Sequence, residues 1–140
     1  MRKTIIIATI ILVATFQIKA QKTTASQISF EETVFNFDTI LQNSSGEHVF
    51  RFTNEGNAPL LITSAFSSCG CVVPEWPKEP VAPGLASNIK VKYNTSKTGQ
   101  FTKVIVVKSN AENCPKTILR INGVVVEAKE KSNQDNKTKH

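Results

Sequence analysis

The sequence predicts an all-β protein: a single immunoglobulin-like, antiparallel β-sandwich of about seven strands. After residue 20, short runs alternate between apolar and polar residues, and no run repeats with the period of an amphipathic helix. Gly, Pro, Asn and Ser cluster between these runs, roughly every ten residues. The alternation is clearest over 48–53 and 89–93, as expected of strands with one buried and one exposed face.

The predicted strands follow one another with turn residues between them. We expect turns at 42–46, 54–57, 94–99 and 109–115, where Asn, Gly, Ser and Pro gather. Strands are then expected at 28–30, 34–37, 48–53, 60–66, 89–93, 101–108, 117–121 and 124–126. The large core side chains are expected to be phenylalanines on these segments: Phe30, Phe35, Phe37, Phe50, Phe52, Phe66 and Phe101.

A proline-rich segment interrupts the series of strands after residue 73. Proline lacks the amide donor that a sheet interior requires, so Pro74, Pro77 and Pro80 predict an ordered crossing loop over residues 74–84. The loop ends in Pro83-Gly84, which fits the centre of a type II turn because glycine accepts the positive φ of that turn.

Residues 1–20 have the features of a secretory signal peptide. Met1 to Lys3 carries positive charge, residues 5–16 are almost wholly apolar, and Ala20 is the small residue that a signal peptidase requires. The apolar run is shorter than the roughly 20 residues of a transmembrane helix, which argues against a retained anchor. We expect cleavage after Ala20, export to the periplasm or the cell exterior, and a mature chain that does not span the membrane.

The mature chain has room for one domain. We expect a short linker over 21–27, the sandwich over 28–126 and a disordered charged tail over 127–140, because that tail is too polar to form a core. Of the 17 Lys and Arg residues, three lie in the first 20 residues, which leaves 14 against 11 acidic residues. This weak positive balance, together with export, argues against nucleic-acid binding.

Several short motifs in order make the chain resemble a known bacterial family. They occupy residues 52–62, the Ser-Cys-Gly-Cys at 68–71, Pro83-Gly84, 99–101 and 109–110. The chain resembles domain-of-unknown-function family 1573, which is similar to the Hydin-type immunoglobulin-like domains, over about residues 28–125. Two positions depart from the family pattern: Val72 stands where a threonine is usual, and Thr39 where a glycine is frequent. The resemblance implies a seven-stranded sandwich and export, and it implies no established reaction.

Cys69-Gly70-Cys71 is the one group of residues that could carry chemistry. Side chains at i and i+2 of an extended chain project to the same side, and thiolates favour Cu(I) or Zn²⁺. A tetrahedral zinc site requires four ligands, however, and the mature chain offers only Cys69, Cys71, Cys114 and His48 outside the tail. We therefore expect no metal and no other cofactor, with these four residues as the candidates if a soft metal is bound.

The same cysteines allow a redox site or a disulfide, because exported thiols meet an oxidising environment. A direct Cys69–Cys71 bond is difficult in an extended chain, where Cα atoms at i and i+2 lie about 7 Å apart, unless Gly70 bends it. A bridge from Cys114 to either residue is easier if the 109–115 turn and the end of the 60–66 strand share one end of the sandwich. A third interpretation makes Cys69 and Cys71 small, half-buried residues at a tight bend.

Other candidates point to contacts with a partner. Trp76 is either a stacking platform or, as we favour, a plug that holds the proline-rich loop on the sandwich. Val104 and Val106 lie on a strand face that points away from the core, beneath a loop or against a partner. Four lysines at 90, 92, 103 and 108 form either a basic patch or, as we favour, charges that protect strand edges.

No complete catalytic signature occurs in the sequence. It has no Gly-x-Ser-x-Gly elbow, no Gly-rich phosphate loop and no His-Glu-x-x-His motif. His48 lies beside Phe50 and Phe52 in the alternating pattern, which favours a structural role. We expect an exported, non-catalytic binding or structural module of the cell envelope whose partner is a protein or an envelope component. The alternative is a thiol-based redox or soft-metal-binding protein that uses Cys69-Gly70-Cys71.

Overall fold

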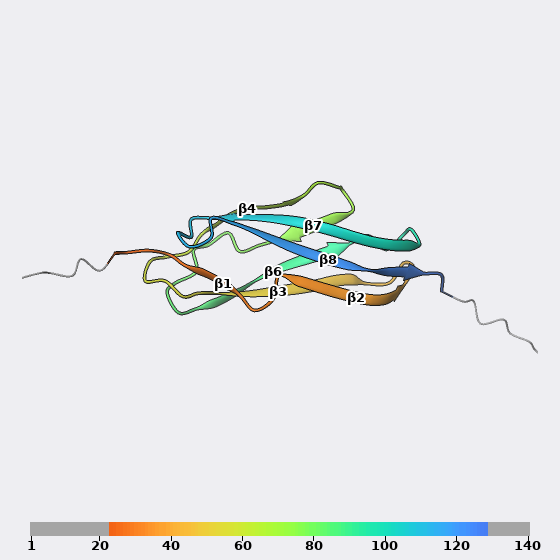
Figure 1. The fold of residues 1–140 in the computed structure, drawn as a ribbon, viewed down its shortest axis with the longest axis horizontal. Helices are drawn as coiled ribbons and strands as arrows, with labels where there is room; N and C mark the ends of the chain where they lie inside the picture. Colours follow the sequence, from red (N-terminus) through yellow and green to blue (C-terminus); the bar gives the residue numbers. More distant parts are fainter. Residues whose placement is uncertain (1–22, 129–140) are drawn as a thin grey trace, which may run out of the picture.

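Two four-stranded β-sheets lie face to face in the computed structural model, which describes residues 23–128 (Figure 1). The predicted all-β, immunoglobulin-like sandwich is confirmed, with eight strands. The predicted signal peptide, residues 1–20, and most of the predicted tail lie outside the described residues. Between residues 23 and 128 there is no helix that could cross a membrane.

The first sheet has the strand order β1-β3-β6-β5. All three of its pairings are antiparallel, and β3 pairs with β6 over eight residues from Gly46↔Tyr93 to Thr53↔Ala86. Its strands are β1 (Ile28–Phe30), β3 (Gly46–Asn54), β6 (Ala86–Tyr93) and β5 (Val72–Glu75).

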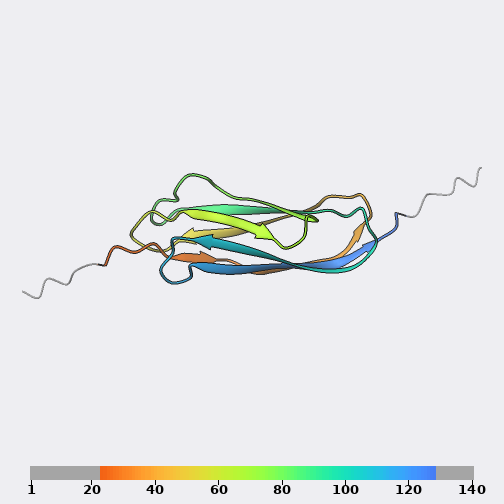
Figure 2. The ribbon, with the colours of Figure 1, turned by 90° about the horizontal axis from the view of Figure 1, so that it is seen from above.

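The second sheet has the strand order β2-β8-β7-β4. Two of its pairings are antiparallel, whereas β2 runs parallel to β8. The chain crosses from the first sheet to the second after β1, so β2 lies beside the last strand of the chain without a hairpin between them. Its strands are β2 (Val34–Leu41), β8 (Lys116–Val126), β7 (Gly99–Ser109) and β4 (Ile62–Ser67). Seen from above, β1 begins and β8 ends at opposite ends of the long axis (Figure 2).

The prediction of a loop over 74–84 is wrong at its start. Val72–Glu75 forms β5, in which Pro74 lies opposite Val91. The strand tolerates this proline because β5 is an edge strand and needs no ladder hydrogen bond on its outer side. The predicted type II turn is present: Gly84 has a φ of 77°, and the Leu85 amide donates to the Ala82 carbonyl at 3.1 Å.

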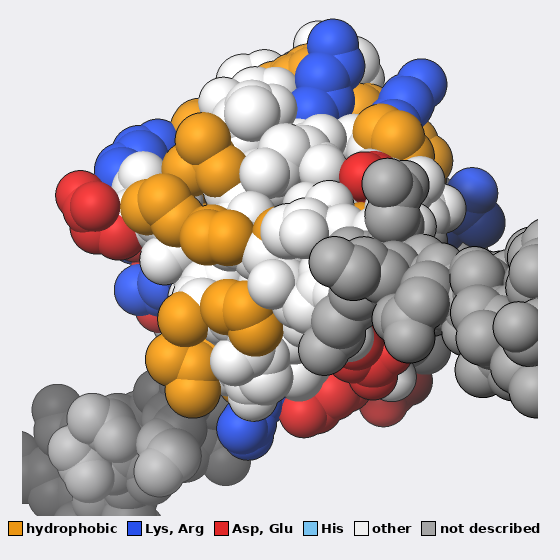
Figure 3. Space-filling model, turned by 90° about the vertical axis from the view of Figure 1, so that its left-hand side faces the viewer, with side chains coloured by type: hydrophobic (Ala, Val, Ile, Leu, Met, Phe, Trp, Pro, Cys, Tyr) orange, Lys and Arg blue, Asp and Glu red, His pale blue; other side chains and the backbone are white. Residues whose placement is uncertain are grey.

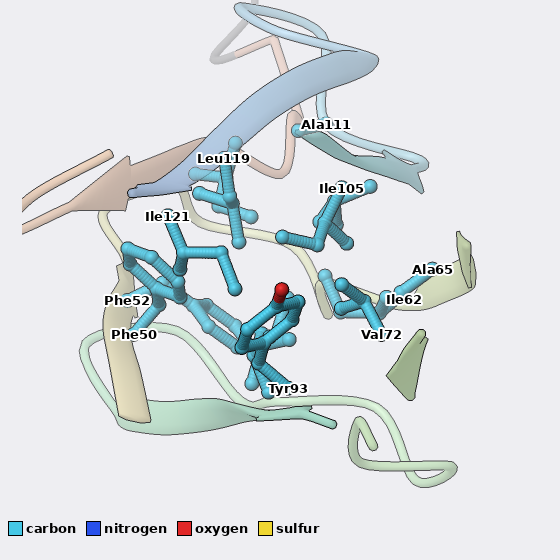
Figure 4. Packing of buried hydrophobic residues seen from close by; sticks show 14 of the residues in the cluster. Phe50, Phe52, Ile62, Ala65, Val72, Tyr93, Ile105, Ala111, Leu119 and Ile121 are labelled. Carbon is cyan, nitrogen blue, oxygen red and sulfur yellow. The ribbon is translucent and has the colours of Figure 1, made fainter. Parts of the chain in front are cut away.

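The core lies between the sheets (Figure 4). Three predicted phenylalanines, Phe50, Phe52 and Phe101, are buried, and Phe30, Phe35 and Phe37 pack against them while partly exposed. Phe66 is a correction, since it is 47% exposed. A bulge between Ile62 and Ser64 breaks the alternation of β4, so that Ile62 and Ala65 face inward and Phe66 faces outward. The other fully buried large side chains are Leu60, Ile89, Ile105, Leu119, Ile121, Val91, Val107, Val125 and Asn54.

Part of the predicted linker 21–27 is bonded into the domain. The Ser26 hydroxyl donates to the Asn110 carbonyl at 2.9 Å, and the Ala25 carbonyl accepts from the Asn57 amide at 2.9 Å. Gly56 permits this close approach, because a Cβ at that position would lie 2.6 Å from the Gln27 nitrogen. Residues 25 and 26 are therefore held against the sandwich by polar loops, just before β1 begins at Ile28.

Candidate functional site

Cys69 and Cys71 form a disulfide across the turn between β4 and β5. Their Cα atoms lie 5.3 Å apart, shorter than in an extended chain, because residues 69–71 form a turn. That separation is within the range that a disulfide spans. The two cysteines are half-buried at a tight bend around Gly70, as one interpretation of the sequence had it, and they are also bonded to each other.

The alternative bridge from Cys114 to Cys69 or Cys71 is not formed. Register pairs Ile62 with Ser109 and Ser67 with Ile105, so the 109–115 turn lies at the start of β4, while Cys69 follows its end. At about 3.3 Å per residue, the two positions are separated by roughly the length of β4. Cys114 is the free cysteine of the described residues; it is half-buried, and its sulfur lies 3.3 Å from the Lys116 carbonyl oxygen.

His48 lies away from the cysteines, in an aromatic cluster between the sheets. Its ring stacks on Phe35 at 3.5 Å between centroids and meets Phe50 edge to face at 4.7 Å. Its Nε2 lies 2.7 Å from Glu32 Oε1. Within residues 23–128, no three metal-ligating side chains gather at one place. The structure therefore does not bring together the four metal candidates, and His48 has the neighbours of a packed, hydrogen-bonded side chain.

The disulfide lies on the rim of two shallow depressions. One has a volume of about 400 Å³ and includes Lys92, and the other, of about 410 Å³, includes Lys97 and Lys103. Gly70 and Cys71 line both, and no Asp or Glu of the described residues lines either. Tyr93 also lines both depressions, and burial raises the pKa of its phenol. The disulfide thus lies in an electropositive, partly exposed setting.

The disulfide adds little to the stability of the fold. A bond that closes so short a loop stabilises by about 1.5 kcal/mol on the chain-entropy estimate, against about 3 kcal/mol for a 15-residue loop. Sheet pairing already holds both flanks, since Ser67 pairs with Ile105 and Val72 with Tyr93. The Asn94 amide also donates to the Cys71 carbonyl at 2.8 Å.

A second candidate lies on the outer face of the β2-β8-β7-β4 sheet. Phe66, Val106 and Ile118 are cross-strand neighbours in one row over β4, β7 and β8. Phe66 is 47% and Ile118 41% exposed, while Val104 and Val106 are half-exposed on the same face. We call these four residues the apolar row. The predicted outward direction of Val104 and Val106 is thus observed, since both are half-exposed while Ile105 and Val107 are buried.

Three exposed cations flank the apolar row. Lys108 and Lys116 are direct cross-strand neighbours, and Arg120 lies opposite Val104. Lys108 Nζ lies 5.8 Å from the centre of the Phe66 ring. In the described part of the chain, none of the three cations makes an ion pair. The one acidic residue in the strands of this sheet is Asp38 on β2, whose carboxylate accepts from Asn36 Nδ2.

The opposite outer face has its charges paired. Glu47 contacts Lys90 at 3.1 Å and Lys92 at 3.5 Å, and hydrogen bonding to Lys90, then to Lys92, lowers the pKa of that carboxyl. The prediction that the four lysines protect strand edges is wrong, because β6 and β7 are both interior strands. Instead, Lys90 and Lys92 lie on this outer face, Lys108 lies beside the apolar row on the other outer face, and Lys103 lines a depression with Cys71.

Trp76 directly follows β5, an edge strand of the β1-β3-β6-β5 sheet. It is half-buried against the core, and Lys78 Nζ lies 3.2 Å from the centre of its ring. The side chain thus has both the packing of a plug and a cation on its face. At the end of the sandwich where the described chain begins, apolar side chains form separate groups between polar atoms (Figure 3).

One family profile matches residues 28–125, described as "Protein of unknown function (DUF1573)". The chain belongs to the DUF1573 family. The family resemblance inferred from the sequence motifs is therefore confirmed. A comparison of this DUF1573 chain with curated proteins gives no significant match.

Solved structures share the fold of this DUF1573 domain at low sequence identity. A protein of unknown function from Porphyromonas gingivalis W83 superposes with a TM-score of 0.65 and 10% identity over 76% of this chain and 50% of that chain. The ASH/PapD-like domain 7 of human CEP192 gives 0.58 and 10% over 79% and 92%. The periplasmic chaperone SfaE gives 0.50 and 10% over 71% and 57%. These likenesses show the fold, and the DUF1573 chain spans only half of the Porphyromonas gingivalis protein.

Sequence reasoning missed several residues that complete the two candidate sites. Lys97 and Lys103 line one depression with Cys71 only because the 94–99 turn and β7 lie near the β4–β5 turn. Ile118 joins the apolar row only through the register of β7 with β8. Strict alternation around Ile105 could have signalled Lys103, since a lysine in register with the inward-facing residues of a core strand is unusual.

Proposed function

We propose that the chain is an exported, non-catalytic immunoglobulin-like module that binds another protein of the cell envelope. The observation that carries the proposal is the apolar row flanked by unpaired cations on one outer sheet face. Groups of exposed apolar side chains with a polar border are typical of protein-binding surfaces. The face offers apolar contact and positive charge, without a nucleophile beside a general base.

Charge identifies the kind of partner. Like charges directly opposite each other on a sheet are destabilising, and Lys108 and Lys116 occupy such positions. An acidic group between them would relieve this repulsion and pair both ammonium groups. The partner is therefore a protein segment that presents apolar side chains to Phe66 and Ile118 and carboxylates to Lys108, Lys116 and Arg120. Electrostatic complementarity of this kind gives specificity and a faster association.

Export supports the envelope as the place of action. Residues 1–20 have the charged start, apolar stretch and small final residue of a secretory signal peptide. The likeness of the fold to the periplasmic chaperone SfaE agrees with that address. The disulfide agrees with it as well, since disulfides persist in oxidising compartments.

Binding is tested with a synthetic peptide in which glutamates alternate with leucine and phenylalanine. We expect fluorescence anisotropy to show micromolar binding of this peptide to the full mature chain, weakened by added salt because the charges are exposed. The double change Lys108→Glu and Lys116→Glu reverses the charge of the face, and should weaken binding about tenfold or more.

The matched control reverses two lysines on the other side of the domain. Lys78→Glu with Lys90→Glu gives the same change in net charge and should leave peptide binding unchanged. Absence of binding by the unmodified chain contradicts the proposal, as does equal binding by the two double variants. Self-association of the chain through the apolar row, lost in Phe66→Ala, would also contradict it, because the occupant would then be a second copy.

Export is tested by expressing the full-length chain in a Gram-negative host. We expect the envelope fraction to contain a protein that begins at Gln21, measured by intact mass and N-terminal sequencing. Ala20→Leu removes the small residue that signal peptidase requires and should leave the precursor uncleaved, whereas Ala20→Gly should be processed. Precursor that stays in the cytoplasm in the unmodified form would contradict export.

A further inference from the structure

We propose that the Cys69–Cys71 disulfide is a redox-active site that accepts two electrons from a dithiol, with Lys97 and Lys103 stabilising the Cys71 thiolate that is released. This activity is separate from the proposed binding function, because the disulfide and the apolar row involve different residues. Three features carry the proposal: access to the disulfide, positive charge beside it, and its small contribution to the fold.

A thiol can reach the disulfide from the solvent-exposed side of the turn between β4 and β5. Gly70 is exposed, and a Cβ placed on it would meet no atom within 4 Å. Beside the turn lie two overlapping depressions of about 400 and 410 Å³, both lined by Gly70 and Cys71, which have room for a thiol-bearing side chain. Cys69 and Cys71 are themselves half-buried. A thiol can therefore approach from solvent without unfolding of the sandwich.

Charge favours the thiolate form of Cys71. Reactive cysteines are typically found in electropositive, partly exposed settings, because the thiolate is the species that reacts. Lys97 and Lys103 line the same depression as Cys71, and among the described residues neither makes an ion pair. A carboxylate there would cancel the effect, and no Asp or Glu of residues 23–128 lines that depression.

The exchange proceeds in two steps. A thiolate of the dithiol attacks Cys69 Sγ, the Cys69–Cys71 bond breaks, and Cys71 leaves as a thiolate, which gives a mixed disulfide. Cys71 is the leaving group because Lys97 and Lys103 line the same depression and favour its thiolate. The second thiolate of the dithiol then attacks the first sulfur of the dithiol, which is bonded to Cys69 in the mixed disulfide, and Cys69 is released as a thiolate. Two electrons pass to the domain, the dithiol becomes a disulfide, and its two protons are available to the released thiolates.

The fold does not depend on this bond. Ser67 and Val72 lie on either side of the turn, and each is held in a sheet by register with another strand. Reduction would therefore leave the sandwich in place, as a reversible redox site requires. A disulfide needed for folding would not permit this cycle.

The test measures reduction of the oxidised mature chain by dithiothreitol in a Cys114→Ser background, with alkylation and intact mass as the readout. We expect Lys97→Gln with Lys103→Gln to slow reduction about fivefold to tenfold, since both lysines favour the leaving thiolate. The control Lys78→Gln with Lys90→Gln removes the same charge outside both depressions and should reduce at the original rate. Equal rates for the two double variants would overturn the proposal.

Two further measurements separate a redox role from a structural one. In Cys69→Ser with Cys114→Ser, the pH profile of Cys71 alkylation should have its midpoint below the ordinary thiol value of about 8.5, and should move up when Lys97 and Lys103 are replaced by glutamine. Cys69→Ser with Cys71→Ser should retain the fold and bind the acidic peptide. If that variant unfolds, or if the Cys71 midpoint is ordinary, the redox proposal is overturned while the binding proposal is still tested by its own lysines.

Discussion

Phe52→Ala should lower the free energy of unfolding by about 3–5 kcal/mol, which is a large part of the stability of a domain of this size. Phe52 is fully buried in β3, and its ring lies 5.5 Å from that of Phe30 between centroids. Figure 4 shows it beside Phe50, facing Ile121 of the other sheet. Truncation removes contacts with both sheets and leaves a cavity that the rigid strands cannot close.

Urea denaturation followed by the fluorescence of Trp76, the only tryptophan in the chain, measures this loss. The control is Phe66→Ala, the same truncation at a phenylalanine that is 47% exposed on the outer face. We expect it to change the free energy of unfolding by less than about 1 kcal/mol. Comparable losses at the two positions would mean that Phe66 is a core residue, as the sequence alone suggested, and would contradict the bulge in β4.

Asn54→Ala should lower the free energy of unfolding by about 3 kcal/mol, because it removes three hydrogen bonds of a fully buried side chain. Asn54 is fully buried at the end of β3. Its Nδ2 donates to the Ala58 carbonyl at 2.8 Å and to the Val81 carbonyl at 2.9 Å. Its Oδ1 accepts from the Gly56 amide at 3.0 Å. One side chain thus ties the turn after β3 to the loop that precedes β6.

Thermal and urea denaturation of Asn54→Ala are to be compared with Asn110→Ala. Asn110 also makes two hydrogen bonds, accepting from the Leu61 amide at 2.8 Å and donating to the Pro59 carbonyl at 3.1 Å, but it is exposed and water can replace them. We expect about 1 kcal/mol or less for this control. Equal losses would show that burial of Asn54 is not what makes it important.

Local pattern was sufficient to predict most strands. Alternation over 48–53 and 89–93 lies within β3 and β6, and Pro83-Gly84 makes the type II turn that its residues favour. Side-chain period and turn chemistry are properties of neighbouring residues, so the sequence contains them directly. The same reasoning failed at Pro74, because whether a strand can hold a proline depends on whether it lies at the edge of its sheet.

Contacts between residues that are far apart in the chain could not be predicted from the sequence. The sequence by itself determined the fold class, the family, the outward face of Val104 and Val106, and Cys69-Gly70-Cys71 as the reactive candidate. Only the tertiary structure decided that Cys69 bonds to Cys71 rather than to Cys114, and that Lys103 lies beside the disulfide. The physical reason is register: which side chains meet across a sheet or between two loops depends on strand pairings and bulges that depend on the whole chain.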